Sequence, residues 1–468
     1  MKVALINTNR MQPPVAPIAL DYIAEALHAA GHAVQLLDLC WEADPGTAVA
    51  RFFKNSNFGL VGMTLRNTDD CAFTSGQSFL PGFIELVEAV RENSDAPIVA
   101  GGVGFSVMPE QVLALSNADF GIWGEGEFAL PELAARLEDK LPHLDLPGLI
   151  RRENGSWRRN PPSWRSLAEL PSMSREWVDN RRYFRFGGQA GFETRRGCSG
   201  RCVYCADPVA KGNCVRLRPP SAVVDEIERL MAQGIDVLHT CDGEFNIPEK
   251  HALGICREIT GRGLGGKLSW YAYCAPAPFS RELARAMRDA GCVGIDFGVD
   301  NGSADMLRRL GRAFGPSDIL NAAQRAKEQG ITVMLDLLLG APGESRESIE
   351  ETVALVRRAD PARAGVSLGV RVYPGTELAA QVASGEHAGG LTGGKDAFDP
   401  VFFVEQRIAP HVFDWLNTLI GDDRRFLFYD PTRPKQNYNY NANDRLVEAI
   451  QKGYRGAFWD ILRLYESE

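Results

Sequence analysis

Three cysteines stand close together in the middle of the chain. Cys198, Cys202 and Cys205 belong to the run Gly-Cys-Ser-Gly-Arg-Cys-Val-Tyr-Cys that begins at Gly197. Three thiolates with this spacing can each hold one iron of a [4Fe–4S] cluster, which leaves the fourth iron without a protein ligand. A catalytic metal site needs such an open coordination position. The spacing therefore predicts a reactive iron–sulfur cluster.

Two other interpretations of these cysteines are open at this point. Cys214 could supply the fourth ligand of a structural zinc site. Free cysteines are also among the most buried residues, so three of them could gather in a core without a metal. Disulfides are not expected among the ten cysteines, because the start MKVALINTN does not have the pattern of a secretory leader.

Alternating strands and helices are predicted to position this loop. In the first 140 residues we expect strands at 3–9, 33–39, 58–65, 96–102 and 119–124, separated by helices at 18–28, 80–93, 109–116 and 127–138. Several of these strands are too apolar for a sheet that faces water, which is typical of parallel sheets covered by helices. Residues 1–140 are therefore predicted to form an α/β domain, a doubly wound (Rossmann-like) parallel sheet of about five strands.

The alternation resumes after a proline-rich stretch. Residues 141–188 contain five prolines and are predicted to be an irregular linker. Over residues 189–390, strand–helix units of about 30–40 residues repeat roughly six times, which favours a partial (β/α)6 barrel of the TIM type. A complete barrel is the alternative. The cysteine loop follows the first strand, where a barrel carries its active site. Residues 391–468 are aromatic-rich and form the predicted C-terminal capping region.

Charge and hydropathy limit the partners of this chain. The 468 residues carry a formal net charge of −9, and proteins that bind nucleic acids usually present a basic surface. No segment approaches the roughly 20 apolar residues of a membrane span. We therefore expect a cytoplasmic monomer that binds neither nucleic acid nor membrane and acts on a small-molecule, peptide or protein substrate.

Four further turns of the second domain combine glycine with acidic residues or proline. They are Cys241-Asp-Gly-Glu-Phe245, Val299-Asp-Asn-Gly-Ser303, Leu339-Gly-Ala-Pro-Gly-Glu344 and Val372-Tyr-Pro-Gly-Thr-Glu377. Each turn alone is explained equally well by a tight bend of the backbone. Together with the cysteine loop, and in this order, they resemble the radical S-adenosylmethionine (SAM) superfamily.

The resemblance implies a SAM site beside the cluster. Tyr204 would lie beside the adenine, and Glu244 or Asp242 would bind the methionyl amino group. Asp300 would approach the ribose. The implied set of SAM-binding residues is Tyr204, Asp242, Gly243, Glu244, Asp300, Gly340, Pro342 and Arg371. Arg371 has two alternative roles: it could pair with a substrate carboxylate or neutralise a neighbouring acid.

Glycine-rich turns in the first domain resemble the cobalamin-dependent branch of the superfamily. In that branch, turns after the fourth and fifth strands hold the nucleotide tail and the edge of the corrin, as expected at the carboxyl ends of an open parallel sheet. The residues here are Gly101, Gly102, Val103, Gly104, Gly124, Glu125, Gly126 and Glu127. A dinucleotide site is the alternative, although the first turn, residues 7–14, has no glycine to approach a pyrophosphate.

The loop after the third strand would face the lower side of the cobalt. Many cobalamin proteins place the histidine of a D-x-H-x-x-G motif there, and this sequence has no such motif. The loop begins Thr64-Leu-Arg-Asn67, so Leu65 or Arg66 would lie beneath the corrin. Without a strong lower ligand, loss of the methyl group from cobalt should be easier. Arg66 could instead form an ion pair with Asp69 or Asp70.

The resemblance implies a cobalamin-dependent radical SAM C-methyltransferase, similar to tryptophan 2-C-methyltransferase or the glutamine C-methyltransferases of methanogens. Such an enzyme moves a methyl group from SAM, by way of methylcobalamin, to a carbon of an amino acid, peptide or protein residue, and takes electrons from a flavodoxin- or ferredoxin-type donor. A radical and a non-radical transfer are both open. The alternatives are a cyclase, ring-contraction or rearrangement enzyme, and a non-catalytic cobalamin or cluster sensor. Candidate substrate contacts are Trp270, Tyr271, Tyr273, Tyr438 and Tyr440.

Overall fold

A computed structural model describes residues 1–430 and 439–467 of the chain. The N-terminal sheet has the order β2-β1-β3-β4-β5-β6-β7. Its first five strands are parallel, which confirms the predicted doubly wound sheet. These strands are β1 (Lys2–Asn7), β2 (Ala33–Asp38), β3 (Leu60–Thr64), β4 (Ile98–Gly101) and β5 (Phe120–Ile122).

The predicted linker is not wholly irregular. It contributes a hairpin, β6 (Leu149–Glu153) and β7 (Ser156–Arg159), that extends the first sheet in antiparallel fashion. Asn154 and Gly155 form its turn with positive φ angles of 50° and 80°, a conformation that Asn-Gly pairs favour. The hairpin therefore corrects the expectation of an irregular segment, and the domain boundary at residue 140 stays a prediction.

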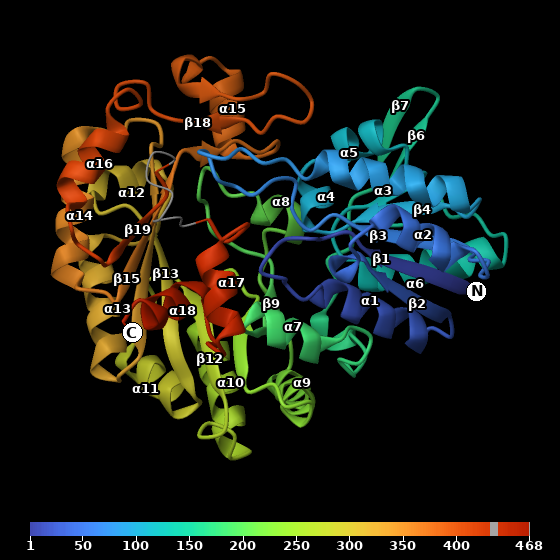
Figure 1. Cartoon of the computed structure of the whole chain (residues 1–468), viewed down its shortest axis with the longest axis horizontal. Coiled ribbons are helices and arrows are strands. Elements are labelled where there is room, and N and C mark those ends of the chain that lie inside the picture. The colour runs from blue at the N-terminus through green and yellow to red at the C-terminus, as the bar shows by residue number, and fades with distance from the viewer. Residues whose placement is uncertain (431–438, 468) are drawn as a thin grey trace.

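Helices cover both faces of this sheet (Figure 1). The helices α1 (Ile18–Ala29) and α6 (Gly126–Glu138) pack on each other and bury apolar residues of one face. The opposite face is covered by α2 (Pro45–Phe53), α3 (Leu80–Asn93) and α5 (Pro109–Ser116). Short elements complete the first part of the chain: η1 (Leu39–Trp41), α4 (Val103–Val107), η2 (Leu167–Glu169) and α7 (Asn180–Gly187).

The second sheet is an open, parallel barrel fragment of seven strands, in the order β8-β11-β12-β13-β14-β15-β19. Its strands are β8 (Ala190–Phe192), β11 (Val237–Thr240), β12 (Ser269–Cys274), β13 (Cys292–Asp300), β14 (Thr332–Leu339), β15 (Arg363–Leu368) and β19 (Phe426–Phe428). The first six confirm the predicted partial barrel. The seventh comes from the C-terminal region, which the sequence did not indicate.

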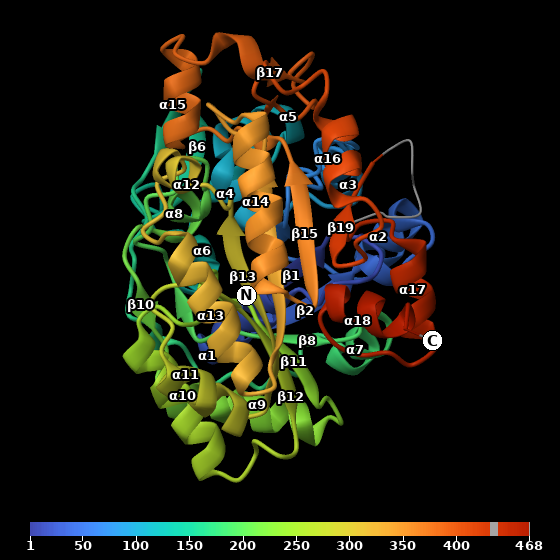
Figure 2. The same cartoon turned by 90° about the vertical axis from the view of Figure 1, so that its left-hand side faces the viewer.

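Outer helices surround this sheet, as Figure 2 shows for α13, α14 and α16. They are α9 (Pro220–Ala232), α10 (Glu249–Gly261), α11 (Arg281–Asp289), α12 (Ala304–Arg309), α13 (Pro316–Glu328), α14 (Arg346–Ala359) and α16 (Val412–Ile420). On β13, Ile295, Phe297 and Val299 belong to the core beneath these helices. Because successive side chains of a strand point to opposite faces, Asp296, Gly298 and Asp300 face the barrel interior.

The C-terminal region covers the open side of the barrel. The helices α17 (Asp444–Gln451) and α18 (Phe458–Tyr465) pack on each other, and α18 contacts β15. Trp459 packs against Tyr271 from inside the barrel, and the Tyr271 hydroxyl donates to Asp460 over 2.8 Å. The remaining elements are β9 (Arg195–Arg196), α8 (Asp207–Lys211), β10 (Arg216–Leu217), β16 (Val370–Arg371), α15 (Glu377–Ala383), η3 (Ala388–Gly390), β17 (Leu391–Thr392) and β18 (Phe402–Phe403).

A buried charge network joins the two halves of the molecule. The guanidinium of Arg175 donates to Asp21 of α1, 2.7 Å away, and to Glu226 of α9, 2.5 Å away. Glu226 also binds Arg218 and the Tyr22 hydroxyl. These side chains are at most 3% exposed, so the network fixes the first domain against the barrel. No helix in the described part of the chain is both long and apolar enough to cross a membrane.

Candidate active site between the two sheets

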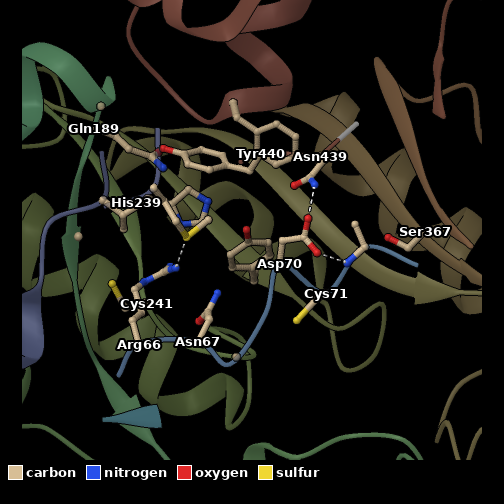
Figure 3. A pocket seen from close by; sticks show the side chains of 18 of the residues that line it. Arg66, Asn67, Asp70, Cys71, Gln189, His239, Cys241, Ser367, Asn439 and Tyr440 are labelled. Carbon is tan, nitrogen blue, oxygen red and sulfur yellow. Dashed lines mark hydrogen bonds between the residues drawn. The ribbon is translucent and has the colours of Figure 1, made fainter. Parts of the chain in front are cut away.

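A cavity of about 620 Å³ lies where the carboxyl ends of the two sheets face each other. The first domain contributes the loops after β1 and β3, the barrel contributes the ends of β11, β12 and β15, and the C-terminal region closes the cavity. Figure 3 shows the labelled side chains that converge on it: Arg66, Asn67, Asp70, Cys71, Gln189, His239, Cys241, Ser367, Asn439 and Tyr440. The cavity is therefore built by segments from the whole chain.

A second cavity of about 310 Å³ continues into the first domain. Arg66 and Cys241 line both cavities. Gly102 shows why glycine is required here: its φ is +103°, and a Cβ atom would lie 2.5 Å from the carbonyl oxygen of Leu65. The predicted cobalamin-binding residues that line this cavity are Thr64, Arg66, Gly101, Gly102, Val103, Gly124, Glu125, Gly126 and Glu127.

Three of the predicted cobalamin-binding residues lie elsewhere. Leu65 is buried in the core of the first domain, with 3% exposure. A Cβ at Gly104 would lie 2.8 Å from the backbone of Asn67, so Gly104 serves close packing of two loops. Asn67 and Leu65 also border a third cavity, of about 560 Å³, on the α3 side of the loop after β3.

Glu125 and Glu127 bind barrel arginines at the edge of the second cavity. Arg196 pairs with Glu127 at 2.6 Å and with Glu193 at 2.8 Å. Arg216 pairs with Glu125 at 2.6 Å. The turn predicted to hold a ligand thus contains two acids that bind arginines of the second domain. Through these buried pairs the turn also joins the first domain to the barrel.

Arg66 is free to face the cavity. Asp69 pairs with Arg371 at 2.9 Å, and Asp70 accepts hydrogen bonds from Ser75, the backbone of Ala72 and Asn439. No carboxylate within the described ranges pairs with Arg66, whose Nη1 lies 3.6 Å from the Met11 sulfur. The ion pair with Asp69 or Asp70 is thus not formed. Of the two candidates for the lower side of the corrin, the structure presents Arg66 and buries Leu65.

The three clustered cysteines share one loop between β9 and α8. All three are partly buried, and Arg312 donates to the Cys202 sulfur over 3.0 Å. In the described residues, no three His, Cys, Asp or Glu side chains converge on the position of a single ion. Cubane ligands need not converge in this way, because each thiolate binds a different iron. Cys214 is exposed, whereas the three clustered cysteines are partly buried, and no convergent group of ligands in the described residues includes it.

Several predicted SAM-binding residues gather beside this loop. The Tyr204 hydroxyl donates to Asp300 over 2.7 Å, and Arg312 lies 3.3 Å from Asp300 and 3.7 Å from Glu244. Burial raises the pKa of Glu244 to about 7, against the opposing charge of Arg312. The structure thus brings Tyr204, Asp300 and Glu244 together, and it adds Arg312, which no sequence motif had marked.

Asp242 and Arg371 are committed to other contacts. Asp242 accepts from the backbone and hydroxyl of Thr194 and from the backbone of Arg195, which leaves Glu244 as the accessible acid of this turn. Arg371 binds Asp69 and donates to the carbonyls of Val372 and Val401. Arg371 therefore neutralises a neighbouring acid, which is one of the two roles expected for it, and its place in the SAM site stays a prediction.

The turn after β14 holds a buried carboxyl group. Gly340 adopts a φ of +95° and donates its N–H to Glu344 over 3.3 Å, and Asn301 donates to the same carboxyl group over 3.1 Å. Pro342 lies in this turn, and neither it nor Gly340 lines one of the cavities described above. Burial raises the pKa of Glu344 to about 7, against these hydrogen bonds.

Replacing Glu344 by glutamine should change the pH dependence of stability. Between an unfolded pKa of about 4.5 and the folded value of about 7, the native state holds more protons than the unfolded state, so native stability falls as the pH rises. Glu344→Gln removes this loss, which amounts to at most about 3 kcal/mol above pH 7. Urea denaturation at pH 5 and pH 8 measures it. A variant with the wild-type pH dependence would contradict the prediction.

Two of the predicted substrate contacts lie away from the cavity. Trp270 points into the core beneath the outer helices, and its Nε1 donates to the Ala290 carbonyl over 2.8 Å. Tyr271 points inward but packs on Trp459 of α18. These placements correct the expectation for both residues. Tyr273 and Tyr440 do line the cavity, and Tyr438 lies outside the described residues.

Comparisons with known proteins agree with this geometry. The sequence model of the B12 binding domain matches residues 5–134, and that of the radical SAM superfamily matches residues 192–356. Tryptophan 2-C-methyltransferase of Streptomyces laurentii is 33% identical over 444 aligned residues, which cover 81% of this chain and 74% of that protein. The chain belongs to the cobalamin-dependent radical SAM methyltransferases.

Solved structures of this methyltransferase family superimpose on the whole chain. The radical SAM methyltransferase TsrM of Kitasatospora setae, solved with a tryptophan substrate and a SAM analogue, has a TM-score of 0.93 at 30% identity. The match covers 100% of this chain and 98% of that one. A TsrM structure with cobalamin and a [4Fe–4S] cluster gives 0.91 at 29% identity, with the same coverage. The cobalamin-dependent enzyme OxsB shares the fold, with a TM-score of 0.72 at 16% identity.

The family confirms the predicted enzyme class, fold class and cofactors. The methyltransferase works with a [4Fe–4S] cluster, SAM and cobalamin. The alternative of a cyclase or rearrangement enzyme has less support, because tryptophan 2-C-methyltransferase and TsrM, at 33% and 30% identity to this chain, are methyltransferases.

Proposed function

We propose that this methyltransferase transfers a methyl group to the indole ring of tryptophan or of a closely related aromatic amino acid. The observation that carries the proposal is the aromatic wall of the central cavity. Its members come from five places in the chain, namely Phe73, Tyr273, Tyr429, Tyr440 and Phe458. Flat aromatic faces suit a planar ring, and the relatives described above act on or bind tryptophan.

The test is an anaerobic assay of the fully reconstituted protein. Tryptophan, SAM, cobalamin and a reductant are supplied, and product mass is followed. We expect a product heavier by one methyl group, with S-adenosylhomocysteine formed from SAM. If the protein methylates a tryptophan-containing peptide but not free tryptophan, the substrate is the peptide and not the amino acid. Production of neither compound would refute the proposal.

We assign roles to this chain's residues from their positions. Cys198, Cys202 and Cys205 would hold the cluster, and Tyr204 with Asp300 and Glu244 would bind SAM beside it. The glycine turns after β4 and β5 would hold the cobalamin tail in the second cavity. Bound cobalamin supplies the methyl group, and the cluster supplies electrons at the SAM site. The protein's part is to hold these groups beside one another between the two sheets.

Arg66 is proposed to lie beneath the cobalt without binding it. A guanidinium stays protonated and has no free lone pair, so it cannot act as a strong ligand. Arg66→His would offer an imidazole at this place. We expect a cobalt-bound nitrogen to become visible in the electron paramagnetic resonance spectrum of the cob(II)alamin form, and methylation to slow by on the order of 10-fold or more.

Arg66→Lys serves as the control for this substitution, because it keeps the positive charge and adds no neutral ligand at pH 7. It should give no nitrogen signal. If the histidine variant shows none either, while binding cobalamin fully, Arg66 does not face the lower side of the cobalt.

We also propose a monomer that receives electrons from a flavodoxin- or ferredoxin-type protein. The support is positive charge beside the cluster loop. Arg201 lies within that loop and is exposed. On the adjacent α12, Arg308 and Arg309 share one acidic partner, Asp305, so the helix keeps an excess of positive charge. The backbone N–H of Val203 binds the carbonyl of Leu310, which joins the loop to the end of α12. Small electron carriers with acidic surfaces would be attracted to this face.

A further inference from the structure

His239 is a buried histidine of the central cavity with no part in the proposed cluster, SAM or cobalamin sites. It is the third residue of β11, is 8% exposed, and lines the 620 Å³ cavity. Its ring centroid lies 4.8 Å from that of Tyr273, at an angle of 51°. In Figure 3 the imidazole lies among the labelled side chains around the cavity. Histidine at this place is thus part of the proposed substrate wall.

The hydrogen bonds of His239 fix its tautomer. Its Nδ1 lies 2.7 Å from the backbone carbonyl oxygen of Thr240. A carbonyl oxygen only accepts, so Nδ1 carries the proton and Nε2 of the neutral ring carries a lone pair. Burial lowers the pKa of His239 to about 4, so the ring is neutral at physiological pH. The imidazole is therefore a hydrogen-bond acceptor at Nε2.

Among the described residues, no side chain or backbone group donates a hydrogen bond to this Nε2. This Nε2 is not among the fully buried, unpartnered polar atoms of the described residues, so it is open to the cavity that His239 lines. A bound ligand that covered it without donating a hydrogen bond would leave a buried acceptor unpaired, which is unfavourable. The ring stands beside the aromatic wall, where a substrate would lie. A ligand that brings an N–H group to this wall would satisfy the acceptor.

We propose that His239 Nε2 accepts a hydrogen bond from the ring N–H of the substrate and thereby selects a heteroaromatic ring that carries one. The inference rests on the proposed function, because it names the contact that recognises the indole. A hydrocarbon or sulfur-containing ring of the same shape would leave Nε2 unpaired. His239 is thus a specificity-determining residue, and the aromatic side chains around it supply shape.

The experiment compares tryptophan with β-(3-benzothienyl)alanine, in which sulfur replaces the ring N–H. Binding and kcat/KM are measured for the reconstituted wild type, His239→Phe and His239→Gln, with cluster and cobalamin content checked by absorbance. We expect the wild type to bind tryptophan roughly 5- to 150-fold more tightly than the sulfur analogue. His239→Phe should bring this ratio close to one by weakening tryptophan binding alone. His239→Gln, which keeps an acceptor oxygen, should restore part of it.

The outcomes separate this assignment from the proposed function. Equal wild-type affinity for the two compounds, with methylation of tryptophan, would overturn the role of His239 and leave the function standing. If His239→Phe keeps the wild-type preference for tryptophan over the sulfur analogue, the role of His239 is overturned as well. If the wild type binds neither compound, the function and the assignment both fail. The wild-type comparison needs no variant to fold, so it tests the assignment by itself.

Discussion

Cys202→Ala should abolish both the iron–sulfur cluster and methylation. Removing one of three thiolates leaves an iron without its ligand, and Arg312 would lose the sulfur to which it donates. Since the cofactors carry the chemical step, we expect turnover to fall by on the order of 10³-fold or more. The measurements use anaerobically reconstituted protein. They are the iron and sulfide content, the visible absorbance of the cluster and the amount of methylated product.

Cys214→Ala is the matched control for this experiment. Cys214 is exposed and belongs to the same region, but only the zinc interpretation gives it a role as ligand. It should keep full cluster content and activity. A Cys202→Ala protein with unchanged iron content would contradict the cluster assignment. Loss of metal in Cys214→Ala would instead support the zinc interpretation.

Arg175→Met should give the largest loss of stability among single side-chain changes at the domain junction. The Arg175 side chain is fully buried between Asp21 and Glu226. Removing it leaves the buried Asp21 carboxylate without a cation, while Glu226 keeps Arg218, and breaking such a buried pair costs about 3–5 kcal/mol. Burial raises the pKa of Tyr22, so the tyrosine stays neutral and adds no further negative charge to the network. Chemical denaturation measures the change.

Arg257→Met provides the comparison at the surface. The side chains of Arg257 and its partner Glu282 are 69% and 68% exposed, and exposed pairs contribute about 0–1 kcal/mol. Its denaturation midpoint should stay close to that of the wild type. If both variants unfold at the same denaturant concentration, the buried network does not hold the two domains together.

The repeating elements could be predicted because their signals are local. Apolar runs and helical spacing identified five parallel strands in the first domain and six in the second, and the cysteine spacing identified a cluster. The β6–β7 hairpin was missed, although Asn154-Gly155 is a turn signal. The prolines around it had suggested an irregular linker without strands. β19 has only three residues, too few for a period to be visible.

Side-chain direction could be predicted less well than element type. Trp270 and Tyr273 lie on one strand, three residues apart, so the two-residue period places them on opposite faces. The error was to treat all aromatic residues of β12 as one group. Arg312 and His239 could not be found from spacing, because each gains its role from residues of other strands and loops.

The loop after β3, which would form the floor under the cobalt, is held by segments far along the chain. Asp70 is bound by Asn439, 369 residues later, and Asp69 by Arg371, 302 residues later. Contacts of such separation form late in folding, because a long stretch of chain must first be ordered. The floor therefore reaches its final shape only after barrel and C-terminal region have docked. An isolated first domain would fold its sheet and still lack a rigid seat for the cofactor.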